Sequence, residues 1–108
     1  MIEPIIADIQ QAVENETQRA KLVHGDRYAS LHEAWGVLSE EEMEGRTEGE
    51  KVSHSLVELL FAIHADDRYR LLQEVRYTRK RAVNAACEYI QVAAVCAKIM
   101  DSMETGNN

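Results

Sequence analysis

The chain has 108 residues, of which 45% are hydrophobic and 29% are charged, and its formal net charge at pH 7 is −7. This size and balance indicate one folded, soluble domain and exclude a disordered chain. The negative charge argues against sequence-independent binding to nucleic acid or to an anionic membrane, because both require a basic surface.

The beginning of the chain has no basic segment and no long apolar core, so no signal peptide is expected. The apolar stretches near the C-terminus are interrupted by Glu88, Gln91 and Lys98, which predicts that no segment spans a membrane. Cys87 and Cys96 fall in one predicted helix, about 13 Å apart along its axis, which is too far for a disulfide bond. Reduced thiols and a cytoplasmic location are therefore expected.

Helix-breaking residues are scarce, because the only proline is Pro4 and there are five glycines. Apolar side chains recur at helical spacing over residues 4–24, which predicts a first helix there. Ser30 is followed three residues later by Glu33, and this capping-box pattern predicts that a second helix begins at Ser30. Gly45 is expected to end that helix.

The stretch 45–49 is predicted to be a loop, and an apolar stripe over 50–64 predicts a third helix. The stretch 66–103 contains no helix breaker and would be roughly 55 Å long as a single helix. A compact chain of this length has a radius of gyration of about 13 Å. The stretch should therefore bend, or project and pack against a second subunit. A break at 75–78, followed by a last helix over 79–103, is the expectation.

Together these elements predict the all-α class, as an antiparallel helical bundle of four to five helices. One helical domain is expected over 1–105, followed by a disordered tail at 106–108. No internal repeat or low-complexity segment is present in the sequence.

Four glutamates crowd one part of the second predicted helix, with no basic residue among them: Glu40, Glu41, Glu42 and Glu44. Like charges one turn apart destabilise a helix, and a bound divalent cation would remove that cost. Glu41 and Glu44 leave the same face of the helix. Glu88 and Gln91 belong to one polar stripe of the last helix. If these two faces meet, they form the carboxylate-lined site that Mg²⁺ prefers; the alternative is two solvated faces without metal.

The chain resembles the small phage and prophage members of the MazG-like group in two segments, 32–44 (HEAWGVLSEEEME) and 88–94 (EYIQVAA). These are all-α nucleoside triphosphate pyrophosphohydrolases, which hold Mg²⁺ with an E-x-x-E pair on one helix and an E-x-x-D pair on a later one. Glu41 and Glu44 match the first pair, and Glu88 matches the first acid of the second. Gln91 departs from the pattern, because it stands where the group has aspartate. The gap between the two pairs is also longer than usual, as if the helix at 50–64 were inserted.

The resemblance implies Mg²⁺-dependent hydrolysis of a nucleoside or deoxynucleoside triphosphate to the monophosphate and pyrophosphate, as housekeeping of the nucleotide pool. Glu40 would orient or deprotonate the attacking water. A homo-oligomer, dimer or tetramer, is expected, because members of the group assemble their clefts between subunits. No nucleic-acid or membrane partner is expected. The implied metal ligands are Glu41, Glu44, Glu88 and Gln91.

Two other functions remain open. Gln91 favours a catalytically degenerate relative that binds nucleotide or metal without turnover. The apolar stripe over 50–64 favours a small phage helical protein that docks a partner, if that stripe is exposed. Arg79, Lys80 and Arg81 are candidate phosphate contacts, or else the solvated start of the last helix.

Overall fold

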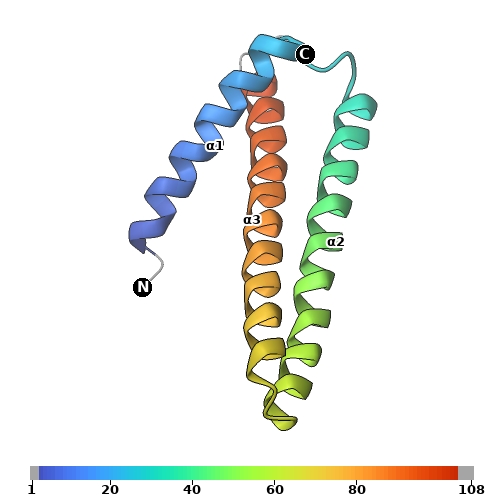
Figure 1. Ribbon diagram of the computed structural model, residues 1–108. Helices are drawn as coiled ribbons and strands as arrows, with labels where there is room; N and C mark the ends of the chain where they lie inside the picture. The colour runs from blue at the N-terminus through green and yellow to red at the C-terminus, as the bar shows by residue number, and fades with distance from the viewer. Residues whose placement is uncertain (1–2, 105–108) are drawn as a thin grey trace. The chain divides into compact units, whose positions relative to one another are not determined.

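The computed structural model describes residues 3–104, and these are all-α, with no strand among them. The all-α class is therefore confirmed. The predicted number of four to five helices is wrong, and the predicted tail at 106–108 lies outside the described residues. Three helices follow one another along the chain (Figure 1): α1 (Glu3–His24), α2 (Leu31–His64) and α3 (Arg68–Glu104).

The number of helices is smaller than predicted because two expected breaks do not occur. The stretch 45–49, predicted to be a loop, lies inside α2, so Gly45 does not end a helix. A glycine inside a helix is unfavourable by only about 0.5–1 kcal/mol, and the long helical segments on both sides compensate. The stretch 75–78, predicted to be a break, lies inside α3 and contains neither proline nor glycine.

The boundary between α1 and α2 was predicted correctly, because it is set by residues with specific backbone roles. Gly25 follows α1 with a φ of 90°, a left-handed conformation that glycine adopts without strain. Ser30 caps α2, since its Oγ accepts a hydrogen bond of 3.1 Å from the N–H of Glu33. The carboxylate of Glu33 accepts a hydrogen bond of 3.2 Å from the N–H of Ala29. Glu33 is thus a capping residue.

Two glycine substitutions test this description of the backbone. Gly36→Ala is expected to stabilise the chain by about 0.5–1 kcal/mol, because alanine favours the helix and a Cβ at Gly36 meets no atom within 4 Å. The matched change Gly25→Ala should destabilise by about 1–2 kcal/mol, since alanine is strained at a positive φ. Equilibrium unfolding in urea measures both. Effects of the same sign would contradict the two backbone conformations.

The chain divides into two compact units. The first comprises α1, the start of α2 as far as Glu42 and the end of α3 from Tyr89. In this unit Thr17 of α1 is buried, and Lys21 Nζ lies 2.6 Å from a carboxylate oxygen of Asp101 in α3. The buried residues that α2 and α3 contribute to it are Ala34, Ala94, Val95 and Lys98.

The second unit, residues 43–88, is a helical hairpin in which α2 and α3 run side by side and antiparallel (Figure 1). Asp67 begins α3, because its carboxylate accepts a hydrogen bond of 3.0 Å from the N–H of Arg70. Ala62 is fully buried at the seam between the two helices. In the middle of the seam the Thr78 hydroxyl donates to Ser55 Oγ at 2.8 Å. The seam is therefore narrow and partly polar.

Among residues 3–104, α3 is the one helix that is long and apolar enough to cross a membrane. Only 11% of its apolar 18-residue stretch is buried. Core helices of soluble proteins have the same length and composition. This feature therefore assigns no location, and the expected absence of a membrane-spanning segment stays a prediction.

Candidate metal centre

The continuous course of α2 gives Glu41 and Glu44 a common face, because they are one helical turn apart. Together with Glu88 of α3, they form a group in which one carboxylate oxygen of each residue lies within 4.8 Å of the others. Glu44 and Glu88 both belong to the hairpin unit. Glu41 is held to Glu44 by one turn of uninterrupted helix. The residues thus come together from two helices that are remote in sequence.

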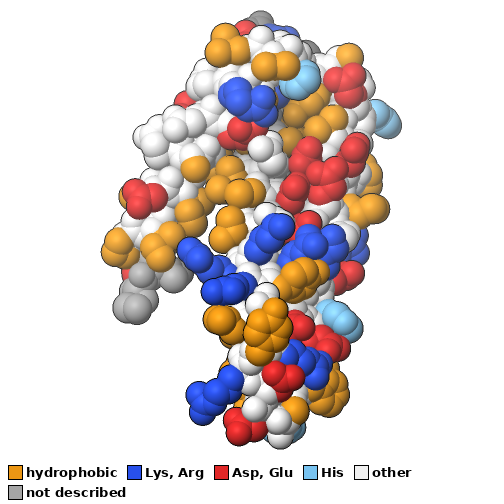
Figure 2. Space-filling view, viewed as in Figure 1, with side chains coloured by type: hydrophobic (Ala, Val, Ile, Leu, Met, Phe, Trp, Pro, Cys, Tyr) orange, Lys and Arg blue, Asp and Glu red, His pale blue; other side chains and the backbone are white. Residues whose placement is uncertain are grey.

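The surroundings of Glu88 in the hairpin disfavour the charged form of its carboxylate. Partial burial raises the pKa of Glu88, and the neighbouring carboxylate of Glu44, followed by the charge of Glu48, raises it further. Acidic side chains gather over the N-terminal half of α2 in Figure 2. Glu88 therefore holds a proton more readily than an ordinary glutamate, and a cation placed between it and Glu44 would relieve their repulsion.

The donor set fits Mg²⁺ chemically. This ion takes hard oxygen ligands at about 2.0–2.1 Å in octahedral geometry, which places pairs of ligand oxygens roughly 3–4 Å apart. The carboxylate oxygens of the group, within 4.8 Å of one another, reach that spacing by small side-chain rotations. Two or three protein carboxylates leave positions for water and for substrate phosphate, which is how Mg²⁺ is usually held.

The other two predicted site residues lie in different surroundings. Glu40 is exposed and lies outside the carboxylate group. Arg19 lowers the pKa of Glu16 in α1, and the nearby side chain of Gln91 lowers it further. The guanidinium of Arg19 lies 2.9 Å from Glu16 at its Nε. The roles of Glu40 and Gln91 at a metal stay predictions.

Of the three candidate phosphate contacts, Arg81 is the one that lies beside an acidic residue of α2, Glu48. Arg81 Nη1 lies 3.3 and 3.5 Å from the two carboxylate oxygens of Glu48, and its guanidinium stacks 4.9 Å from the ring centre of Tyr77. Its buried Nε has no hydrogen-bond partner. Arg79 and Lys80, the neighbouring candidates, are exposed. The only hint of this contact in the sequence is spacing. Glu48 is one turn after Glu44 on α2, and Arg81 is two turns before Glu88 on α3.

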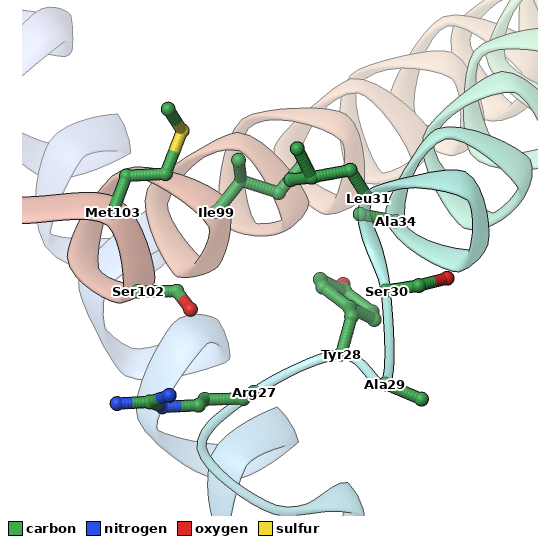
Figure 3. A pocket seen from close by; sticks show the side chains of 9 residues that line it. All are labelled: Arg27, Tyr28, Ala29, Ser30, Leu31, Ala34, Ile99, Ser102 and Met103. Carbon is green, nitrogen blue, oxygen red and sulfur yellow. The ribbon is translucent and has the colours of Figure 1, made fainter. Parts of the chain in front are cut away.

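The first unit contains a pocket of about 250 Å³ beside the start of α2 (Figure 3). Its walls are mainly apolar, and polar side chains of the α1–α2 connection stand at its edge. Burial raises the pKa of Tyr28, whose ring lies 4.0 Å from the ammonium of Lys98. The lining residues on α2 and its connection are Arg27, Tyr28, Ala29, Ser30, Leu31 and Ala34, and those on α3 are Ile99, Ser102 and Met103.

Glu88→Gln is expected to raise the melting temperature of the metal-free protein at pH 7 by about 1–3 °C, because it removes a carboxylate that Glu44 and Glu48 repel. The pKa of Glu88 in the folded state is above the ordinary value of 4.5. Deprotonation of Glu88 therefore lowers the free energy of unfolding as the pH rises from 4.5 through that raised pKa. The increase in melting temperature caused by Glu88→Gln should therefore become smaller toward pH 4. Thermal unfolding in EDTA between pH 4 and 8 measures it, and a pH-independent gain would contradict the assigned cause.

Comparison of the chain with protein-family models, with curated proteins and with solved structures finds no match. The carboxylate group and its surroundings therefore carry the functional conclusion. One carboxylate oxygen each of Glu41, Glu44 and Glu88 lies within 4.8 Å of the others, and Arg81 contacts the neighbouring Glu48.

Proposed function

We propose that this chain is a Mg²⁺-dependent nucleoside triphosphate pyrophosphohydrolase. It would hydrolyse a nucleoside or deoxynucleoside triphosphate to the monophosphate and pyrophosphate. The observation that supports this proposal most is the convergence of Glu41, Glu44 and Glu88 from two helices. The resemblance of the same residues to the MazG-like metal pattern supplies the reaction type.

In the proposed reaction Glu41, Glu44 and Glu88 would hold the metal, which would leave positions for the substrate phosphates. When bound, Mg²⁺ neutralises phosphate oxygens and lowers the pKa of a coordinated water. Water attacks the α-phosphorus, the bond between the α-phosphorus and the bridging oxygen breaks, and pyrophosphate leaves. Glu40 takes the proton of the attacking water; its exposed position on the same helix leaves it accessible to solvent for returning that proton.

Arg81 supports the binding of a polyanion by an acidic chain. With a net charge of −7, an anionic substrate needs a local basic group in order to approach. Arg81 is held loosely by Glu48, at 3.3 Å, and its Nε has no partner. Its guanidinium can therefore turn toward a phosphate without breaking a strong ion pair. We assign the phosphate contact to Arg81 rather than to Arg79 or Lys80.

A second candidate is a relative that binds nucleotide and metal without turnover. The observation that favours it is the side chain of Gln91, which is neutral and lies near Glu16 of α1. The aspartate of the MazG-like pattern would supply a fourth carboxylate at this position. Without that carboxylate, the metal would be held by fewer charges.

We also propose that the chain acts as a cytoplasmic homo-oligomer, dimer or tetramer, and that it comes from a phage or prophage. Its substrate would be a nucleoside triphosphate of the cellular pool. These parts of the proposal rest on the resemblance and on the free thiols of Cys87 and Cys96.

The test is pyrophosphate release from the eight common ribo- and deoxyribonucleoside triphosphates, with Mg²⁺ and with EDTA. The proposal expects release from at least one substrate that EDTA abolishes. Thermal unfolding with and without Mg²⁺ accompanies the assay, since a ligand that binds the folded state raises the melting temperature. A Mg²⁺-dependent rise without release favours the second candidate. Neither a rise nor release would sink both.

A further inference from the structure

The hairpin has a second apolar face that α2 and α3 do not cover for each other. Each of its large side chains keeps between 45% and 56% of its surface exposed. On α2 they lie at positions 56, 60 and 63, and on α3 at 72, 75 and 83, which are steps of three, four and eight residues and keep to one stripe of each helix. The side chains are Leu56, Leu60, Ile63, Leu72, Val75 and Val83, called here the apolar hairpin face.

These six side chains lie on one side of the hairpin. The hydroxyls of Ser55 and Thr78 meet at the seam, so both residues point toward the partner helix. At about 100° per residue, the α2 members lie roughly 80–140° around the helix from Ser55, and the α3 members roughly 60–140° from Thr78. Because the helices are antiparallel, the same rotation turns both sets to the same side.

The opposite side of the hairpin carries ion pairs, together with the exposed side chains of Val57, Phe61 and Tyr77. It carries the ion pair between Arg70 and Glu58 at 2.8 Å and the contact between Arg81 and Glu48. In Figure 2, Lys, Arg, Asp and Glu side chains stand along the lower half of one face of the molecule, with hydrophobic side chains among them. The two ion pairs thus lie away from the apolar hairpin face, as expected if that face is the inner side of one layer in a two-layer structure.

A single hairpin buries too little to be stable in this form. The buried side chains that its two helices enclose are those of Ser55 and Ala62, both small. The apolar hairpin face exposes on the order of 600 Å², which is at the upper end of the range for the largest apolar patch on a monomer, and such patches are often functional. Two such faces together would bury on the order of 1,200 Å², which reaches the lower limit of specific protein interfaces.

We infer that the apolar hairpin face binds the same face of a second copy of this chain, so that two hairpins form a four-helix bundle. A second copy supplies what the face requires: two antiparallel helices of equal length, with apolar stripes at the same spacing. Arg79 lies between Val75 and Val83, and its long stem allows the guanidinium to reach the rim of such an interface. This inference names the surface for the proposed homo-oligomer and does not depend on metal binding.

The test compares the molar mass in solution of the wild type, Leu56→Glu and Phe61→Glu, by sedimentation equilibrium between 1 and 100 µM. Leu56 and Phe61 are 54% and 55% exposed on the same helix, but Phe61 lies on the other side of it. The wild type is expected at twice the chain mass of 12.3 kDa or a multiple of that. Leu56→Glu should weaken association at least about 100-fold, and Phe61→Glu should change it less than about threefold.

A monomeric wild type at 100 µM overturns the inference, because the face is then covered by another part of the chain or by a different protein. Dissociation by Phe61→Glu but not by Leu56→Glu overturns it as well. If Leu56→Glu is unfolded by circular dichroism, the melting temperature of the wild type decides, since it must rise with protein concentration when subunits associate. Pyrophosphate release by a monomer would defeat this inference alone, and an inactive dimer would defeat only the proposed function.

Discussion

Replacing Glu44 with glutamine is expected to lower Mg²⁺-dependent pyrophosphate release by at least about 100-fold in kcat/KM. Glu44 is the member of the carboxylate group that stands next to both Glu41, on its own helix, and Glu88, on α3. Glutamine keeps the size of the side chain but removes the charge that binds a hard cation. The rate is measured over a Mg²⁺ titration, because a lost ligand also raises the metal concentration needed for half activity.

Two other substitutions in α2 separate metal binding from general effects of charge. Glu50→Gln removes an exposed carboxylate one and a half turns further along the helix, and it should leave the rate within about twofold of the wild type. Glu40→Gln should lower kcat while the melting temperature still responds to Mg²⁺, as expected of a base that is not a ligand. Equal losses in Glu44→Gln and Glu50→Gln would show that overall charge, not a metal group, controls activity.

Ala62→Leu is expected to destabilise the protein by about 1–3 kcal/mol, which lowers the melting temperature by roughly 5–15 °C. Ala62 is 0% exposed at the seam of the hairpin, so three extra carbon atoms must push α2 and α3 apart. The unfolding midpoint in urea measures the loss, with an unchanged slope if the folded state keeps its compactness.

The matched control is Ala7→Leu in α1, where the side chain is exposed. Leucine is almost as good a helix former as alanine, so this change should alter stability by less than about 0.5 kcal/mol. If Ala62→Leu were as harmless as Ala7→Leu, the two helices of the hairpin would not pack as closely as described.

The sequence was sufficient to predict the helices and the boundary between the first two, because those depend on local chemistry. Apolar periodicity defines α1, while Ser30 with Glu33 and the positive φ at Gly25 set the connection to α2. The predicted loop at 45–49 was wrong because glycine weakens a helix without ending it. The predicted break at 75–78 was wrong because it came from the average compactness of domains, not from any residue in that stretch.

The candidate site was predictable only in part, for a related reason. The common face of Glu41 and Glu44 follows from helical geometry. Which residue of α3 meets Glu44 depends on the register between two helices, and no local pattern encodes it. Glu88 was chosen from the polar stripe of the last predicted helix and from the resemblance. The contact of Arg81 with Glu48 and that of Gln91 with Glu16 depend on the same non-local information.

The hydrogen bond between Thr78 and Ser55, at the centre of the hairpin, helps to set the register of α2 against α3 and so the position of the acidic group. Thr78 donates to Ser55 at 2.8 Å, and the carboxylates of Glu44 and Glu88 lie roughly 15 Å further along their helices. Sliding α3 by a single turn would separate the hydroxyls and move Glu88 about 5 Å past Glu44. Two neutral oxygens, roughly 15 Å along the helices from these carboxylates, thereby help to set which acids stand opposite each other.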